Sequence, residues 1–105
     1  MINKARATKL ITNSNGDVEG CEYEKDGKTN KIYGPVVIAT GGFAHDYSED
    51  SLFKKYGPHL LSLPTTNGDH CTGDGIKMTL AIGGDAVDME YIQVHPTGLV
   101  DPKNP

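Results

Sequence analysis

The chain has 105 residues, of which 13 are glycine and 36% are apolar, so it is long enough for one domain at most and short of material for a large core. Its formal net charge is −4 and its basic residues are scattered, which argues against a nucleic-acid partner. The longest uninterrupted apolar run covers residues 36–39. A membrane helix needs about 18 apolar residues, so we expect no membrane segment.

The two cysteines, Cys21 and Cys71, do not make a disulfide framework and match no zinc-ligand spacing. We expect both to be free thiols, as in a reducing intracellular compartment such as the cytosol, a mitochondrion or a glycosome-like organelle. His70 precedes Cys71 directly, but adjacent loop residues seldom point the same way, so a catalytic thiolate–imidazole pair is the weaker interpretation.

The first third of the chain predicts an antiparallel meander of three short strands at residues 7–11, 18–24 and 29–33. Asn and Gly at residues 13–17 and the Asp-Gly pair at residues 26–27 are typical of tight turns because these residues tolerate positive φ. Val18 and Tyr23 are candidate apolar anchors of the second strand.

The next segment, PVVIATGG at residues 35–42, changes the pattern. A short β-branched run without alternation is typical of a strand that is buried on both faces of a parallel sheet. Glycines at the carboxyl end of such a strand let the backbone approach a ligand closely. The alternative is a plain turn after a strand.

A helix is predicted over residues 46–56, with Ser48 or Asp46 as its cap and Leu52 and Phe53 facing inward. Gly-Pro at residues 57–58 ends it, and the chain then continues as a loop to Asp69.

A second helix opens at Thr72–Gly75 and ends at Gly83-Gly84. Ile76, Leu80 and Gly83 share one face of it. Residues 85–89 are expected to form a short strand, and residues 91–95 to be extended before Pro96.

Asp74 lies in the first turn of that second helix, where an acidic residue most often complements the helix dipole. In the functional interpretation, the surrounding glycines clear space and free amides at the helix start face a cofactor oxygen. The Asp74 carboxylate would then accept hydrogen bonds from ribityl or ribose hydroxyls.

His95 is the strongest single candidate for a functional residue, although a lone histidine is more often structural. Its place before Pro96, with Gln93 two residues earlier, favours binding of a substrate carboxylate through a charge-assisted hydrogen bond. Thr97 would add a hydroxyl. The other three histidines are expected to be solvated; they are His45, His59 and His70.

Three motifs together resemble the flavoprotein fumarate reductase family, whose members include soluble NADH-dependent enzymes and succinate dehydrogenase flavoproteins. They are VVIATGGF, TTNG followed by CTGDGIKMTLAIGG, and YIQVHPTGLVDPKNP. The likeness spans nearly all 105 residues and is weakest before Val18. It implies an α/β class, here an α+β fragment of a Rossmann-like FAD-binding domain with a meander, a buried parallel strand and two helices. Residues 1–95 would belong to that domain and residues 96–105 to the connection to a capping domain.

The resemblance also implies the site. FAD would be the cofactor and fumarate or succinate the dicarboxylate ligand, with hydride passing from flavin N5. NADH is one candidate electron donor, and quinol and haem partners stay open. The positions that match the family's FAD contacts are Ala39, Thr40, Gly41, Gly42, Thr72, Gly73, Asp74 and Gly75. The positions that match its substrate contacts are His95, Gln93 and Thr97. The family's proton-donating arginine and its G-x-G-x-x-G motif have no counterpart in this chain, so we expect no catalytic residue and no activity of the chain alone. We also expect no metal site.

Two alternatives stay open at this point. The parent enzyme could be a related FAD-dependent urocanate reductase, 3-ketosteroid dehydrogenase or aspartate oxidase, because these share the FAD scaffold. An interpretation of another class is a small non-catalytic interaction domain that folds by itself.

Overall fold

The computed structural model describes residues 1–99 and 101–104. Within this part of the chain, the backbone forms a three-stranded sheet, two α-helices and one 3-10 helix. The contacts divide the chain into two units. The first contains Met1–Gly41 and Gly73–Ala86, and the second contains Gly42–Thr72 and the described residues of Val87–Pro105.

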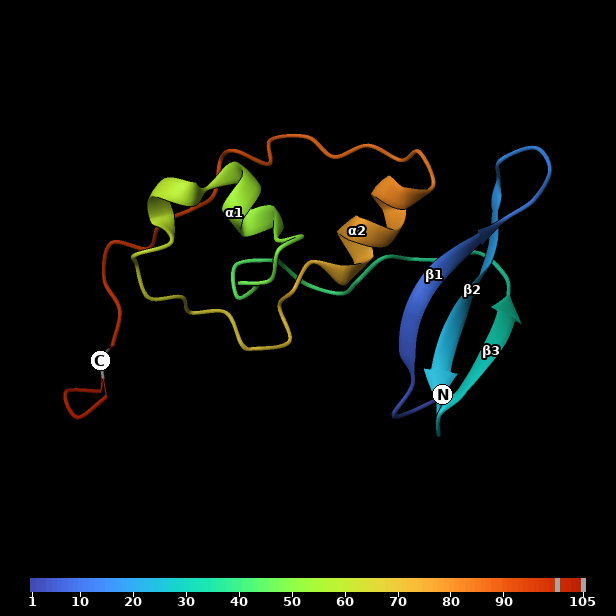
Figure 1. The fold of residues 1–105 in the computed structure, drawn as a ribbon, viewed down its shortest axis with the longest axis horizontal. Coiled ribbons are helices and arrows are strands. Elements are labelled where there is room, and N and C mark those ends of the chain that lie inside the picture. The colour runs from blue at the N-terminus through green and yellow to red at the C-terminus, as the bar shows by residue number, and fades with distance from the viewer. Residues whose placement is uncertain (100, 105) are drawn as a thin grey trace. The chain divides into compact units, whose positions relative to one another are not determined.

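The sheet of the first unit is the predicted meander (Figure 1). Its strands are β1 (Arg6–Thr12), β2 (Val18–Lys25) and β3 (Lys28–Tyr33), antiparallel in the order β1-β2-β3. All three strand predictions are confirmed to within two residues. Both turns form as their residues require. Asn13 Oδ1 accepts the amide protons of the first turn, and in the second turn Asp26 and Gly27 have φ of +54° and +75°.

Burial in the sheet differs from the prediction at its anchors. Leu10 of β1 is 4% exposed and is the buried apolar residue of the sheet, whereas Val18 is exposed and Tyr23 is half-buried. Gly20 of β2 lies so close to β3 that a Cβ atom there would meet Ile32 O at 2.1 Å.

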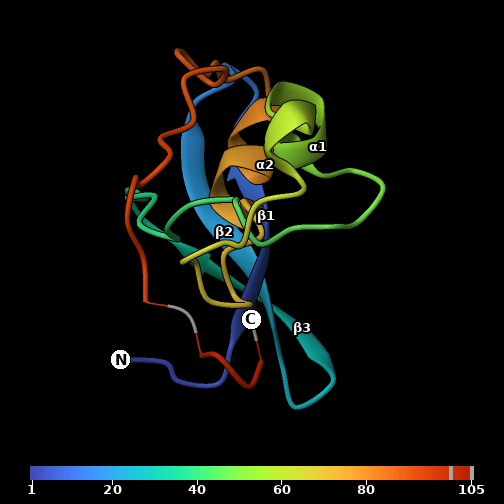
Figure 2. The same ribbon diagram turned by 90° about the vertical axis from the view of Figure 1, so that its left-hand side faces the viewer.

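Helix α2 (Asp74–Ala81) confirms the second predicted helix and contacts β1 (Figure 1, Figure 2). Gly73 caps it with φ of +72°, a conformation that a side chain would strain. At the other end the Gly84 amide donates to Thr79 O at 3.0 Å, so the helix ends at Gly83-Gly84 as predicted. Ile76 and Leu80 are half-buried on the predicted face.

The strand predicted within residues 35–42 does not form in this structure. The backbone there is irregular, and Val37 and Ile38 are 87% and 41% exposed. A strand that is buried on both faces needs hydrogen-bonded neighbours and covering helices. Among the described residues the sheet ends at β3, so nothing there pairs with this segment.

In the second unit, α1 (Leu52–Tyr56) is shorter than predicted, because it begins after Ser51 rather than at Asp46. Ser51 Oγ accepts the Lys54 amide at 3.1 Å and acts as the cap. The helix residues Leu52 and Phe53 are buried, as expected. After Gly57 the chain forms the 3-10 helix η1 (Pro58–Leu60).

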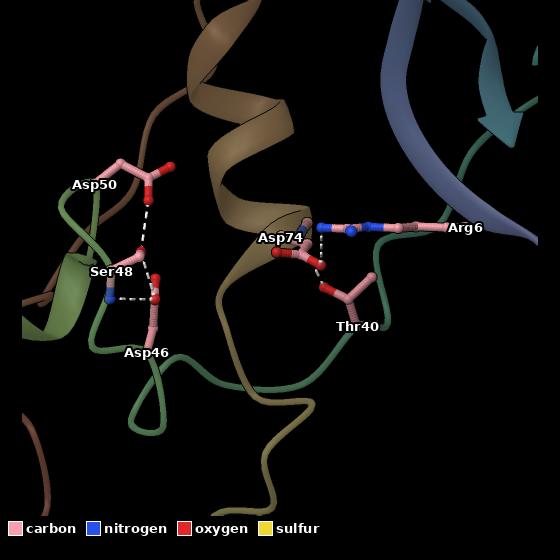
Figure 3. Close-up of polar contacts among 7 residues, drawn as sticks. Arg6, Thr40, Asp46, Ser48, Asp50 and Asp74 are labelled. Atoms are coloured by element: carbon pink, nitrogen blue, oxygen red, sulfur yellow. Dashed lines mark hydrogen bonds and ion pairs between the residues drawn. The ribbon is translucent and has the colours of Figure 1, made fainter.

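The side chains before α1 explain its late start. Ser48 Oγ lies 2.5 Å from Asp46 Oδ1 and 2.6 Å from Asp50 Oδ1, and the Ser48 amide donates to Asp46 Oδ1 at 3.1 Å (Figure 3). Such bonds from short polar side chains to nearby groups compete with a helix. The proposed caps Asp46 and Ser48 therefore stabilise a loop.

The short strand predicted at residues 85–89 is wrong. Asp88 has φ of +57°, which no strand residue adopts, and the Tyr91 amide donates to Asp88 O at 3.1 Å in a turn. Residues 91–95 form no helix or strand.

Candidate functional site

In the first unit, the glycine-rich segment after β3 meets the start of α2. Thr40 Oγ1 accepts the Gly75 amide proton at 3.1 Å. A Cβ atom at Gly75 would lie 2.2 Å from Thr40 Oγ1 and 2.6 Å from Ile38 Cγ2. Gly75 is thus required by the close approach of residues 38–40, and two of the motifs singled out in the sequence meet here.

Asp74 lies at the same junction, and its carboxylate is 4.0 Å from the guanidinium of Arg6 on β1 (Figure 3). The side chains of Asp74 and Arg6 are 39% and 76% exposed, so this ion pair is weak. Gly41, with φ of +81°, has open space among the described residues where a side chain would stand.

This junction fits a hydroxylated part of FAD better than a phosphate. The Gly75 amide is engaged by Thr40, and a carboxylate stands in the first turn of the helix, so the α2 start is a poor anion site. A half-buried carboxylate beside an open glycine turn can accept hydrogen bonds from ribityl or ribose hydroxyls. The expectation that free amides at this helix start face the cofactor is therefore wrong for Gly75.

Six of the eight positions that match the family's FAD contacts belong to the first unit, where Thr40 contacts Gly75. They are Ala39, Thr40, Gly41, Gly73, Asp74 and Gly75. Gly42 and Thr72 belong to the second unit. There, a Cβ atom at Gly42 would lie 3.1 Å from Asn67 Oδ1, and the Thr72 amide donates to His70 O at 3.0 Å.

The second unit contains a pocket of about 580 Å³. Its lining combines an apolar part, including Phe53, Leu60 and Leu63, with two polar segments at residues 65–67 and 93–97. The three positions that match the family's substrate contacts, His95, Gln93 and Thr97, all line it. The described lining residues include no aspartate or glutamate, so the pocket carries no fixed negative charge of its own.

His95 is exposed and held by its own turn. Its ring Nδ1 contacts the Thr97 carbonyl oxygen and lies 3.3 Å from the Thr97 amide. Ile92, at the start of this segment, packs on Gly57, where a Cβ atom would be 2.5 Å from Ile92 Cδ1. The segment that contains His95 is thus anchored against the end of α1.

The other polar segment of the pocket was missed in the sequence. It contains Thr65, Thr66 and Asn67, and His45 is bonded to it: His45 Nδ1 lies 2.8 Å from Asn67 O. His45 is half-buried, so the expectation that it is solvated is wrong. The only signal in the sequence was the run of polar residues Thr-Thr-Asn before Gly68. No local pattern links this run to His45.

Comparison with known proteins identifies the family of the chain. The family model of the FAD binding domain matches residues 1–105. The chain therefore belongs to the FAD binding domain family, and FAD is the cofactor that the family implies.

Two curated relatives are fumarate reductases. The chain is 59% identical to the fumarate reductase of Schizosaccharomyces pombe over 104 residues, which cover 96% of this chain and 20% of the relative. It is 42% identical to fumarate reductase 1 of Saccharomyces cerevisiae over 96 residues, which cover 90% of this chain and 20% of the relative. The chain thus spans about a fifth of the length of these relatives.

A solved structure shares the fold. The crystal structure of 3-ketosteroid-Δ4-(5α)-dehydrogenase from Rhodococcus jostii RHA1 in complex with 4-androstene-3,17-dione is 30% identical in sequence, with a TM-score of 0.73. The match covers 82% of this chain and 18% of that one. Within the described residues, no helix is long and apolar enough to cross a membrane.

Proposed function

We propose that this chain supplies parts of the FAD site and of the substrate site of an FAD-dependent fumarate reductase. The observation that carries the proposal is the pocket of the second unit, which gathers His95, Gln93 and Thr97 without a described carboxylate in its lining. The 59% identity to a fumarate reductase over 96% of the chain supports the choice of substrate.

In this proposal Asp74 accepts hydrogen bonds from FAD hydroxyls, and Thr40 and Gly75 fix the helix start that presents it. A ring N–H of His95 donates a charge-assisted hydrogen bond to one carboxylate of fumarate, and Gln93 and Thr97 add further donors. FAD, when bound and reduced, would supply the hydride for one alkene carbon of fumarate. A proton must add to the other carbon to give succinate, and none of the proposed site residues of this chain supplies it.

The extent of the match indicates that other parts of the parent protein complete the site. Because the chain spans a fifth of its fumarate reductase relatives, we propose that it does not complete the reaction alone. Residues 1–95 would belong to a Rossmann-like FAD-binding domain, and residues 96–105 would lead to a capping domain. In that setting residues 36–39 would pair as a buried parallel strand, since their β-branched side chains favour such a strand. NADH is the proposed electron donor.

The test uses the purified chain and a chimera in which it replaces the matching segment of the S. pombe fumarate reductase. The chain alone should not reduce fumarate with a reduced dye, whereas the chimera should. His95→Ala should abolish activity of the chimera, and His59→Ala, at an exposed position outside the pocket, should not. Fumarate reduction by the chain alone, or full activity of the His95→Ala chimera, would contradict the proposal.

A second candidate comes from the fold neighbour, a 3-ketosteroid dehydrogenase whose structure was solved in complex with a steroid. The apolar part of the pocket, with Phe53, Leu60 and Leu63, gives this candidate some support. Comparing the chimera on fumarate, urocanate and a steroid enone separates these substrates. For the interaction-domain alternative, a cooperative urea melt of the chain without cofactor would be the supporting result.

A further inference from the structure

We propose that His45 is a positioning residue that holds Thr65–Asn67 as a second polar wall of the pocket, and that Thr66 and Asn67 bind oxygens of the dicarboxylate there. The inference rests on the proposed function and deepens it. It adds neutral hydrogen-bond donors to the same pocket that His95 lines.

The first step is the attachment of His45 to the wall. Its Nδ1 lies 2.8 Å from Asn67 O, a geometry in which the ring N–H donates and the carbonyl accepts. The His45 amide also donates to Cys71 O at 3.1 Å. His45 thus joins its own segment to the Thr65–Cys71 loop through side chain and backbone together.

The second step is the conformation of the wall itself. The Asn67 amide donates to Thr65 Oγ1 at 3.1 Å, so the N–H and the C=O of Asn67 are both satisfied within the unit. The Asn67 side chain lies against Gly42, where a Cβ atom would stand only 3.1 Å from Oδ1. These contacts fix the backbone and leave the side chains of Thr66 and Asn67 to define the lining.

The third step links His45 to the apolar part of the pocket. Its ring packs edge-on against Tyr47 with centroids 5.7 Å apart, and Tyr47 packs edge-on against Phe53 at 6.3 Å. Phe53 is buried and lines the pocket. Edge-to-face pairs of this kind restrain ring orientation. One histidine therefore sits between the apolar floor and the polar wall.

The fourth step is chemical. A carboxylate accepts hydrogen bonds only, and a threonine hydroxyl and an asparagine amide both offer donors. Two polar segments on one pocket without a described acidic residue match a small molecule with oxygens at both ends. Neutral donors at the second wall would bind such an oxygen without a positive charge there.

The experiment is an NMR titration of the ¹⁵N-labelled 105-residue chain with succinate, which is a dicarboxylate that cannot be reduced further at its central bond. His45→Leu should weaken succinate binding about 3- to 10-fold, the effect of one hydrogen bond. His45→Asn, which keeps a donor near the Nδ1 position, should restore affinity to within about 2-fold of the unsubstituted chain, since the single bond at issue is regained. His59→Leu is the matched control and should change nothing.

Asn67→Ala provides a second test that leaves the backbone bond to His45 in place, in case His45→Leu fails to fold. It should also weaken binding about 3- to 10-fold. If His95→Ala abolishes binding while His45→Leu and Asn67→Ala do not, the inference is overturned and the role of His95 stands. If His95→Ala binds succinate normally, the proposed substrate role fails instead. A chain that binds no succinate at all overturns the inference, and the chimera then tests the proposed function separately.

Discussion

The substitution Gly75→Ala should destabilise α2, although alanine is normally the better helix former. In an ordinary helix position this change stabilises by about 1 kcal/mol. Here the new methyl group would stand 2.2 Å from Thr40 Oγ1 and 2.6 Å from Ile38 Cγ2. Both distances are far inside van der Waals contact, so residues 38–40 must move away from the helix.

The expected loss of stability is the sum of two unfavourable terms and one favourable term. Overpacking costs about 1–3 kcal/mol, and loss of the hydrogen bond from the Gly75 amide to Thr40 costs about 0.5–1.5 kcal/mol. After the gain in helix propensity is subtracted, the net loss is about 2 kcal/mol, near the middle of the range. This corresponds to a roughly 30-fold fall in amide protection, at 1.4 kcal/mol per factor of ten.

The assay is amide hydrogen exchange over residues 77–81, beginning with the Lys77 amide, which donates to Gly73 O at 2.9 Å. Ala81→Gly, at an exposed position of the same helix, should lower protection by about 1 kcal/mol through propensity alone. Combining Gly75→Ala with Thr40→Ala should cost less than the sum of the two, because the nearest obstacle is removed. Higher protection in Gly75→Ala would refute the close approach of residues 38–40.

Three further outcomes are expected. Gly20→Ala should open the β2–β3 pairing, because the new methyl group meets a backbone carbonyl that cannot rotate away. Its loss of stability should exceed that of Gly75→Ala, and retained amide protection in β3 would contradict this. Ser51→Ala should lower the amide protection of α1 by about 1 kcal/mol, because it removes the cap. Ser48→Ala should have a smaller effect, and equal effects would show that Ser51 is not the cap. Arg6→Gln should change the opening free energy of α2 by less than about 0.5 kcal/mol even at low salt, because its pair with Asp74 is exposed; a larger, salt-sensitive loss would show a stronger pair.

The parts of the fold that the sequence predicts well are those coded by a few neighbouring residues. The Asn13 turn and the Asp26-Gly27 turn fix where the three strands reverse, since their side chains and positive φ values act within the turn. The end of α2 at Gly83-Gly84 is equally local. The match of the FAD binding domain family over residues 1–105 confirms the resemblance that was inferred from three short motifs.

The predictions that fail have two causes: some need partners from distant segments, and others are decided by competition among neighbouring side chains. Residues 36–39 have the composition of a buried strand, yet composition cannot provide the neighbouring strands that such a strand requires. At α1, the side chain of Ser48 is engaged by Asp46 and Asp50, and this leaves Ser51 to begin the helix. The two caps predicted from the sequence, Asp46 and Ser48, are therefore wrong, and Ser51 caps the helix instead.

For the candidate site, the sequence by itself determined the chemical groups, namely His95 in its Pro-Thr-Gly setting and Asp74 among glycines. Only the tertiary structure showed that residues 65–67 share a pocket with His95 and that His45 is bonded to Asn67. His45 and Asn67 are 22 residues apart, so no local periodicity connects them. The physical reason is that a turn or a cap is settled by atoms within a few residues, whereas a pocket wall exists only when distant segments pack together.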